Sequence, residues 1–337
     1  MSRARVRGTV EPQPAAPQTK LQTLSQMIDN AANRPRQPWT SETIEPDSGV
    51  DYTQVLAGPA QRPANTVAGL SAIALGYLII YPGVAGIIVG LGWLVRGRPG
   101  TYGSFSVSAL SFGYLEGMAA GFAALAVFVL IAQFMVRMVH RRRVAWLSSV
   151  QPGLRWRYLV VVAVVATVVL NAVYWVTSGR TDFVWNPQAN AWVWLVIIVL
   201  LAPLQAAGEE YLFRGYLMQV LGTFVRQKWL VVLVSAVVFT LIHGTQNLPL
   251  MLDRFAFGAL MGALVVLTGG LEASVAAHAV NNVFAFGYAS LSGGVANARA
   301  LTEVSWATAG SNIAAYAVIG VIAWLVGRAM KVATRTP

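Results

Sequence analysis

The chain has 337 residues, of which 56% are hydrophobic and 11% are charged, and its net charge is +11. Ordinary globular proteins carry about 25% charged residues, so this composition predicts a polytopic membrane protein. The basic residues lie between apolar runs and form no basic face interleaved with aromatic residues, which argues against nucleic-acid binding and for contact with a lipid bilayer. The absence of cysteine excludes disulfides, a thiol nucleophile and thiolate metal ligands.

The N-terminal part of the chain differs in composition from the rest. Residues 1–62 are rich in Pro, Gln, Thr and Ala and carry scattered charges of both signs. Such a segment offers too few apolar side chains to offset the conformational entropy that ordering costs. We therefore predict a disordered cytoplasmic N-terminal tail over residues 1–62 and a multi-helix transmembrane domain over residues 63–337.

Eight apolar runs follow the tail. A hydrocarbon layer about 30 Å thick is crossed by roughly 20 helical residues, and most of these runs have a comparable length. They cover residues 67–95, 113–136, 158–176, 191–225, 229–243, 255–268, 271–291 and 309–326. The sequence thus predicts an all-α polytopic membrane protein with about eight transmembrane helices.

The basic residues between the runs predict the orientation. Arginine and lysine are dense after the second run (137–157), after the fourth run (226–228) and at the C-terminus (328–335). The alternate loops carry few of them, and Arg254 is assigned to one of these loops. Because basic loops stay in the cytoplasm, we expect a multi-pass protein of the plasma membrane with both termini in the cytoplasm.

The fourth run contains a cluster of charges, Glu209, Glu210 and Arg214. At the centre of a bilayer each charge costs about 3 kcal/mol, so the cluster requires a functional or structural reason. Glu210 and Arg214 are one helical turn apart, and we predict that they form an ion pair. Glu209 projects about 100° round the helix and should need a partner from another segment.

Two histidines lie inside later apolar runs. His243 follows Phe239 by one helical turn, and His278 precedes Asn282 by one turn, so each pair shares a helix face. We expect Phe239 to pack rather than to take part in chemistry. The remaining histidine, His140, lies beside three arginines, where we expect a solvated surface position.

Position along the chain indicates that these groups can meet. Glu209 lies 17 residues before Arg226, and His243 lies 17 residues after it. At 1.5 Å per residue, both are roughly 25 Å from the same cytoplasmic turn. His278 would reach the same depth if the uncharged turn at residues 269–270 is tucked below the surface.

A carboxylate, two imidazoles and a carboxamide in one buried site suit the hydrolysis of an amide bond. Glu209 can act as a general base towards water, and a neighbouring imidazole can share the proton. His278 and Asn282 can donate to the developing oxyanion. Alternatively Glu209, His243 and His278 could hold a zinc ion with an open coordination position. The residue types alone leave both mechanisms open.

The three motifs Glu-Glu-x-x-x-Arg, Phe-x-x-x-His and His-x-x-x-Asn resemble the ordered motifs of the CPBP intramembrane proteases. That family includes the type II CAAX prenyl endopeptidases and bacterial bacteriocin-processing or immunity proteins of the Abi type. The likeness covers about residues 190–290.

The resemblance implies an all-helical membrane endopeptidase whose site opens towards the cytoplasm. Carried across by motif, Glu209 and His243 would activate the water, and His278 and Asn282 would stabilise the oxyanion. Glu210 and Arg214 would support them. A divalent metal such as zinc and a metal-free glutamate mechanism both remain compatible with the resemblance. We expect alanine at Glu209, His243 or His278 to abolish cleavage without loss of insertion.

Two other functions are compatible with the pattern. A non-catalytic membrane immunity or scaffold protein could keep the same residues as a buried polar network. A transporter would predict internal pseudo-symmetry, but the acidic motif has no counterpart in the first half of the chain. For the endopeptidase, the expected substrate is a peptide or the tail of a membrane protein, without a more specific identity.

Overall fold

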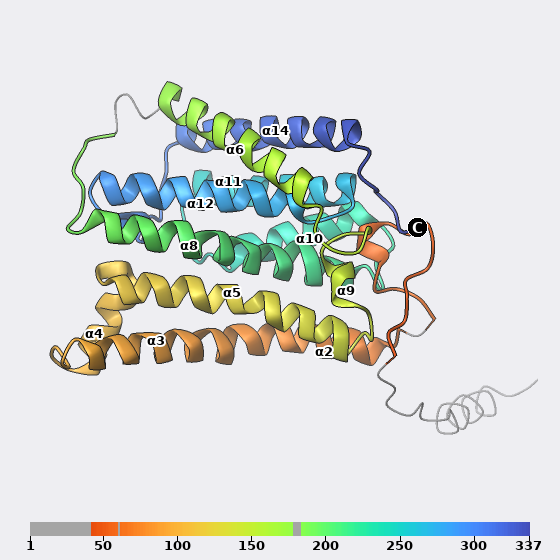
Figure 1. Ribbon diagram of the computed structural model, residues 1–337, viewed down its shortest axis with the longest axis horizontal. Helices are drawn as coiled ribbons and strands as arrows, with labels where there is room; N and C mark the ends of the chain where they lie inside the picture. The colour runs from red at the N-terminus through yellow and green to blue at the C-terminus, as the bar shows by residue number, and fades with distance from the viewer. Residues whose placement is uncertain (1–41, 60, 178–182) are drawn as a thin grey trace, which may run out of the picture. The chain divides into compact units, whose positions relative to one another are not determined.

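A computed structural model describes residues 42–59, 61–177 and 183–337. The chain divides into two compact units, Met1–Glu42 and Thr43–Pro337. Residues 1–41, for which disorder is predicted, lie outside the described residues. The second unit is built from long helices packed side by side (Figure 1).

The predicted all-α fold is confirmed, because the described residues form helices and three isolated β-bridges but no strand. Six helical segments are long and apolar enough to cross a membrane, which supports an integral membrane protein. They are Pro63–Val95 (α2, η2 and α3), Leu115–Met138 (α5), Trp156–Thr177 (α6), Ala191–Leu221 (α8, η5 and α9), Leu248–Thr268 (α11) and Trp306–Ala329 (α14).

The predicted count of eight crossings is not confirmed. The helix α10, Lys228–Leu241, is apolar but only 14 residues long, which gives about 21 Å of helix. The helix α12, Glu272–Leu291, has 20 residues but is not among the six, and polar side chains occur along it. The motif with Phe239 and His243 lies at the end of α10, and the motif with His278 and Asn282 lies in α12.

Short helices connect the long ones. They are η1 (Tyr52–Gln54), α4 (Tyr102–Ser108), η3 (Ala109–Gly113), η4 (Val144–Leu147) and α13 (Val295–Arg299). Two π-helical stretches, η2 (Gly76–Ile80) and η5 (Tyr211–Leu217), lie within the long segments, and the π-helical η3 continues α4. The stretch η5 follows directly on α8 and holds Arg214.

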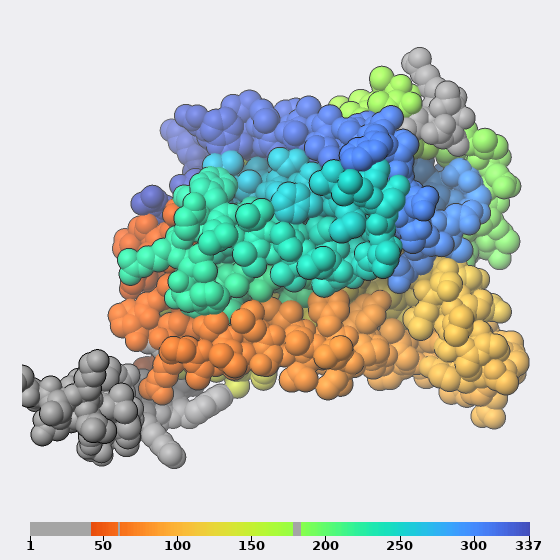
Figure 2. All heavy atoms as spheres, turned by 180° about the vertical axis from the view of Figure 1, so that it is seen from behind, coloured from red at the N-terminus to blue at the C-terminus, as the bar shows by residue number. Residues whose placement is uncertain are grey.

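The helix α8 lies between α5 and α12, as Figure 1 shows, and α12 also packs against α6. On the other side, α11 packs against α10 and α14. Figure 2 shows α10 and α11, in teal and cyan, between the orange segment 63–95 and the blue α14. A close approach of α5 to α8 requires Gly208, since a Cβ at this position would overlap the carbonyl oxygen of Leu125. Glu209 is the next residue.

The predicted disorder is wrong for residues 43–59, which pack against the helix ends. Tyr52, Val55 and Leu56 are buried in one apolar cluster that includes Leu147. The Tyr52 hydroxyl donates to the carbonyl oxygen of Leu147 at 2.5 Å. Composition averaged over 62 residues hid these three apolar side chains, whose spacing lets them share one face.

The same segment holds the C-terminus. The amide of Gly49 donates to the carbonyl of Thr336 at 3.0 Å, and the amide of Thr336 donates to Val50 at 3.1 Å. The carboxylate of Asp51 pairs with Lys228 at 3.2 Å and with Arg335 at 3.6 Å. Residues 43–59, the C-terminus and the start of α10 therefore lie at one end of the helices.

His140 is buried and not solvated, in contrast to the sequence prediction. Its Nδ1 lies 3.0 Å from Oε1 of Gln61, and its Nε2 lies 3.0 Å from the Tyr216 hydroxyl. Because the amide oxygen can only accept, Nδ1 donates, and in the neutral ring Nε2 then accepts from the tyrosine hydroxyl. Burial, with a smaller contribution from the charge of Arg142, lowers the pKa of His140 to about 4.

We expect acid to destabilise the protein through His140. Its pKa rises from about 4 in the folded state to about 6.5 on unfolding, so the unfolded state takes up a proton between these values. Stability is therefore complete above pH 6.5 and falls by up to about 3 kcal/mol as the pH decreases towards 4. Thermal unfolding in nanodiscs between pH 7 and 4.5 measures this loss, and it should be smaller in His140→Asn. An equal loss in both proteins would contradict the assignment.

Candidate functional site

The ion pair between Glu210 and Arg214 is confirmed. Oε1 of Glu210 lies 3.1 Å from Nη1 of Arg214, and both side chains are fully buried. Among the described residues, Nε and Nη2 of Arg214 have no hydrogen-bond partner. The guanidinium instead lies over the rings of Phe239, 4.1 Å from its centroid, and Phe257, at 5.5 Å. Phe239 thus packs, as predicted, and does so against the cation of the first motif.

His278 lies between the two carboxylates. Its Nδ1 is 2.8 Å from Oε1 of Glu210, and its Nε2 is 3.5 Å from Oε2 of Glu209. Since the pairing with Arg214 keeps Glu210 ionised, Nδ1 of His278 must donate to it. Nε2 of the neutral ring then faces Glu209 with its lone pair, so a proton taken up by Glu209 can be shared with this nitrogen.

The second oxygen of Glu209 is held by amides. Nε2 of Gln205 donates to Oε1 of Glu209 at 2.8 Å, and Nδ2 of Asn282 donates to Oε1 of Gln205 at 2.6 Å. Behind them, Nδ2 of Asn281 donates to Oδ1 of Asn282 at 3.1 Å. In this series of hydrogen bonds, each amide group donates to the next one towards Glu209. This arrangement stabilises negative charge on the carboxylate.

The expectation that Glu209 has no partner in its own segment is therefore wrong. Gln205 lies one helical turn before Glu209 on the same helix, and the four-residue interval in the sequence could have indicated the contact. Gln205 and Asn281 are the members of this network that the motifs do not specify.

His243 lies in the loop that follows α10 and is partly buried. Its Nδ1 lies 2.7 Å from the carbonyl oxygen of Phe239, which can only accept, so this nitrogen donates and Nε2 keeps a free lone pair. The imidazole centroid lies 4.6 Å from the ring of Phe239, and that ring lies 6.3 Å from His278. The structure thus brings Glu209 and His278 into contact, while His243 is joined to them through Phe239.

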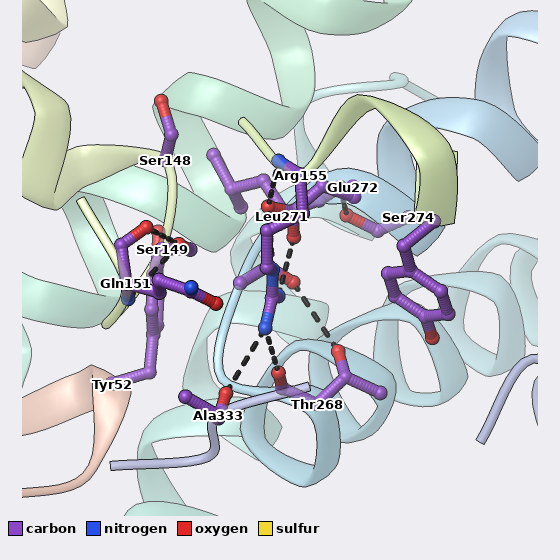
Figure 3. Close-up of polar contacts among 12 residues, drawn as sticks. Tyr52, Ser148, Ser149, Gln151, Arg155, Thr268, Leu271, Glu272, Ser274 and Ala333 are labelled. Carbon is purple, nitrogen blue, oxygen red and sulfur yellow. Dashed lines mark hydrogen bonds and ion pairs between the residues drawn. The ribbon is translucent and has the colours of Figure 1, made fainter. Parts of the chain in front are cut away.

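The helix that carries His278 begins at a turn that is held by several contacts. Gly269 and Gly270, which connect α11 to α12, are buried. Figure 3 shows Arg155 reaching into this turn, where it binds both carboxylate oxygens of Glu272 at 2.6 and 2.9 Å. Its Nη1 also donates to the carbonyl oxygens of Thr268 and Ala333 at 2.9 and 3.0 Å. Arg155 thereby fixes the first turn of the helix to which His278 belongs.

Comparison with known proteins agrees with these motifs. The model of the type II CAAX prenyl endopeptidase Rce1-like family matches residues 188–284, which include all three motifs. We refer to residues 188–284, which are similar to this family, as the Rce1-like domain. The resemblance predicted from the motifs is thus confirmed.

A curated relative, the uncharacterized protein YyaK of Bacillus subtilis (strain 168), is 30% identical over 120 residues. The match covers 31% of this chain and 40% of YyaK, so the chain spans less than half the length of this relative. No solved structure matches the chain.

The alternative zinc site of Glu209, His243 and His278 is not supported by the positions of these side chains. Within the described ranges, no group of three His, Asp or Glu side chains is placed to hold a metal ion. Both ring nitrogens of His278 face carboxylates, and Oε1 of Glu209 already accepts from Gln205. The positions of these donors therefore do not support a metal-dependent protease mechanism.

The predicted loop position of Arg254 is wrong. This residue lies in the second turn of α11 and is half-buried. It shares a face of α11 with Phe257, whose ring lies 4.9 Å from that of His278. The predicted start of the apolar run at residue 255 excluded it, because hydropathy alone ends a run at the first charge.

Proposed function

We propose that the protein is an intramembrane endopeptidase that hydrolyses a peptide bond in a peptide or a membrane protein. The observation that carries the proposal is the buried network of Glu209, His278, Glu210 and Arg214 inside an Rce1-like domain. Such a network of intramembrane ionisable groups is costly and usually marks a functional site.

In the proposed reaction Glu209 is the general base. Gln205 holds Oε1 of Glu209, so Oε2, which faces His278, is the oxygen that takes a proton from water. The resulting hydroxide attacks the peptide carbonyl carbon and forms a tetrahedral oxyanion. When the carbon–nitrogen bond breaks, the proton held between Glu209 and His278 passes to the leaving amine.

The other two motif residues complete the site. His243 presents the free lone pair of Nε2 and can orient the same water. Asn282 uses one amide hydrogen towards Gln205 and retains a second, which we assign to the oxyanion. His278 differs from the role that the motif resemblance implied, because both of its nitrogens face carboxylates and neither is left for the oxyanion.

We further propose that both termini lie in the cytoplasm and that the site opens to that side. Three contacts gather the described termini and the basic segments at one end of the helices. Asp51 pairs with Lys228 and Arg335, and the amide of Ile44 donates to Arg141 at 2.7 Å. The positive-inside rule favours the cytoplasm for this end. Labelling of single cysteines at positions 49 and 336 in intact cells tests the orientation.

The proposed function is tested by comparing protein termini in cells that carry the native protein or Glu209→Ala. We expect a set of new termini that appears only with the native protein, at equal abundance of the two proteins in the membrane. Identical termini in both cell types would overturn the proposal.

Metal analysis of the same purified proteins addresses the cofactor. We propose a metal-free glutamate mechanism, on the ground that the donors bind one another. Stoichiometric zinc in the native protein that is lost in Glu209→Ala would overturn this part and leave the endopeptidase assignment in place.

The alternative is a non-catalytic immunity or scaffold protein. It is favoured by one observation, namely that the buried acids are satisfied by internal partners, as in a purely structural polar network. Full rescue by Glu209→Gln of a phenotype caused by deletion would support this alternative.

A further inference from the structure

Arg254 is a charged residue in a membrane-spanning helix for which the proposed reaction has so far given no role. It is half-buried, and it forms no ion pair with any residue in the described part of the chain. Its Nε is buried and, over the same residues, has no hydrogen-bond partner. Burying a cation in this way is costly, and such a residue usually faces a functional site.

The position of Arg254 on α11 directs it to the candidate site. Phe257 lies three residues later on the same face of the helix, and its ring lies 4.9 Å from that of His278. Arg254 shares the helix face from which Phe257 contacts His278, so its charge lies on the side of α11 that faces the site to which we assign the attacking water. Negative charge that develops on the carbonyl oxygen would arise in this same space.

The other polar groups of the site are already engaged. Arg214 is paired with Glu210, and both nitrogens of His278 face carboxylates. Asn282 has given one amide hydrogen to Gln205. Arg254 is thus the cation of the described site whose charge is not matched by an ion-pair partner.

A neighbouring acid, Asp253, offers a purely structural reason for the presence of Arg254, and the experiment must distinguish it from a role in the reaction. Asp253 is buried and accepts from Nδ2 of Asn312 at 3.4 Å, and the charge of Arg254 acts on it. On this view Arg254 would only offset the charge of Asp253.

We propose that Arg254 is a further catalytic residue, which donates hydrogen bonds to the oxyanion of the tetrahedral intermediate together with Asn282. This inference rests on the proposed endopeptidase function. A fixed guanidinium in a site of low dielectric stabilises charge that forms in the transition state more than it stabilises the neutral substrate. It should therefore act on kcat and leave KM nearly unchanged.

The test uses the full-length protein in nanodiscs of phosphatidylcholine and phosphatidylglycerol. The substrate is a synthetic peptide spanning the strongest Glu209-dependent cleavage found in the comparison of termini. We expect Arg254→Gln to lower kcat by about 10²-fold to 10³-fold with KM within about twofold, and Arg254→Lys to retain part of the rate. Thermal unfolding of each variant shows whether it is folded, and Arg254→Lys decides the question if Arg254→Gln is not.

Controls distinguish the possible failures. Asp253→Asn should keep most of the rate, and the double variant Asp253→Asn, Arg254→Gln should remain as slow as Arg254→Gln. Restoration of the rate in the double variant, an unchanged kcat in Arg254→Gln, or a rise in KM alone would overturn the role of Arg254. A native protein that cleaves no protein in cells would instead overturn the proposed function itself.

Discussion

Replacing Arg214 by alanine is expected to remove most of the protein from the membrane. The change leaves the carboxylate of Glu210 buried with His278 as its remaining partner, and it uncovers the rings of Phe239 and Phe257. Removing one partner of a buried ion pair costs about 3–5 kcal/mol, which is a large part of a typical stability of 5–15 kcal/mol.

Quantitative immunoblotting of membrane fractions measures this effect. The matched control is Arg328→Ala, which removes an exposed arginine from the end of α14 and should leave abundance unchanged. The double variant Glu210→Gln, Arg214→Met removes both charges and should recover part of the lost protein. Normal abundance of Arg214→Ala would contradict a stabilising role of the pair.

The pairing of Glu210 with Arg214 within one helix was predictable, whereas the bond from His278 to Glu210 between helices was not. The four-residue interval between Glu210 and Arg214 fixed their pairing once the segment was recognised as helical. By contrast, the bond from His278 to Glu210 depends on the register of α12 against α8. That register follows from the pinned turn at Gly269 and Gly270, and neither helix encodes it alone.

The fold was predictable where apolar length decides it. Six spans correspond to runs in the sequence, because about 20 apolar residues suffice to predict a crossing. The helices α10 and α12 are the difficult cases, since one is short and the other is polar. Both properties follow from the site, because α10 ends just before His243 and α12 carries the amides that lead to Glu209.

Local composition did not predict the packing of residues 43–59 or of His140, because a few side chains decide it in each case. Residues 43–59 belong to a segment that is polar overall, yet Tyr52, Val55 and Leu56 fill a pocket formed by helix ends. His140 was placed in solvent because its sequence neighbours are arginines, but Gln61 and Tyr216 enclose it from other segments. In both cases the deciding surface is contributed by residues distant in the chain.

Alanine substitutions at His278 and at His243 are expected to differ, although the motifs alone predict the same outcome for both. His278→Ala removes a donor to Glu210 and the group that shares a proton with Glu209, and it leaves two acids buried. We therefore expect loss of cleavage together with a clear loss of protein. His243 is partly buried in a loop and bonds only the carbonyl of Phe239 with Nδ1, so His243→Ala should lower the rate by about 10²-fold to 10⁴-fold at normal abundance.

The two variants are compared by the amount of protein in the membrane and by the yield of Glu209-dependent termini per molecule. His278→Gln is the informative third variant, because its amide can donate to Glu210 but cannot take a proton from Glu209. It should restore abundance and not cleavage. If His278→Ala accumulates as well as His243→Ala, the bridge between the two carboxylates does not stabilise the fold, and the shared proton would then be the reason for this contact.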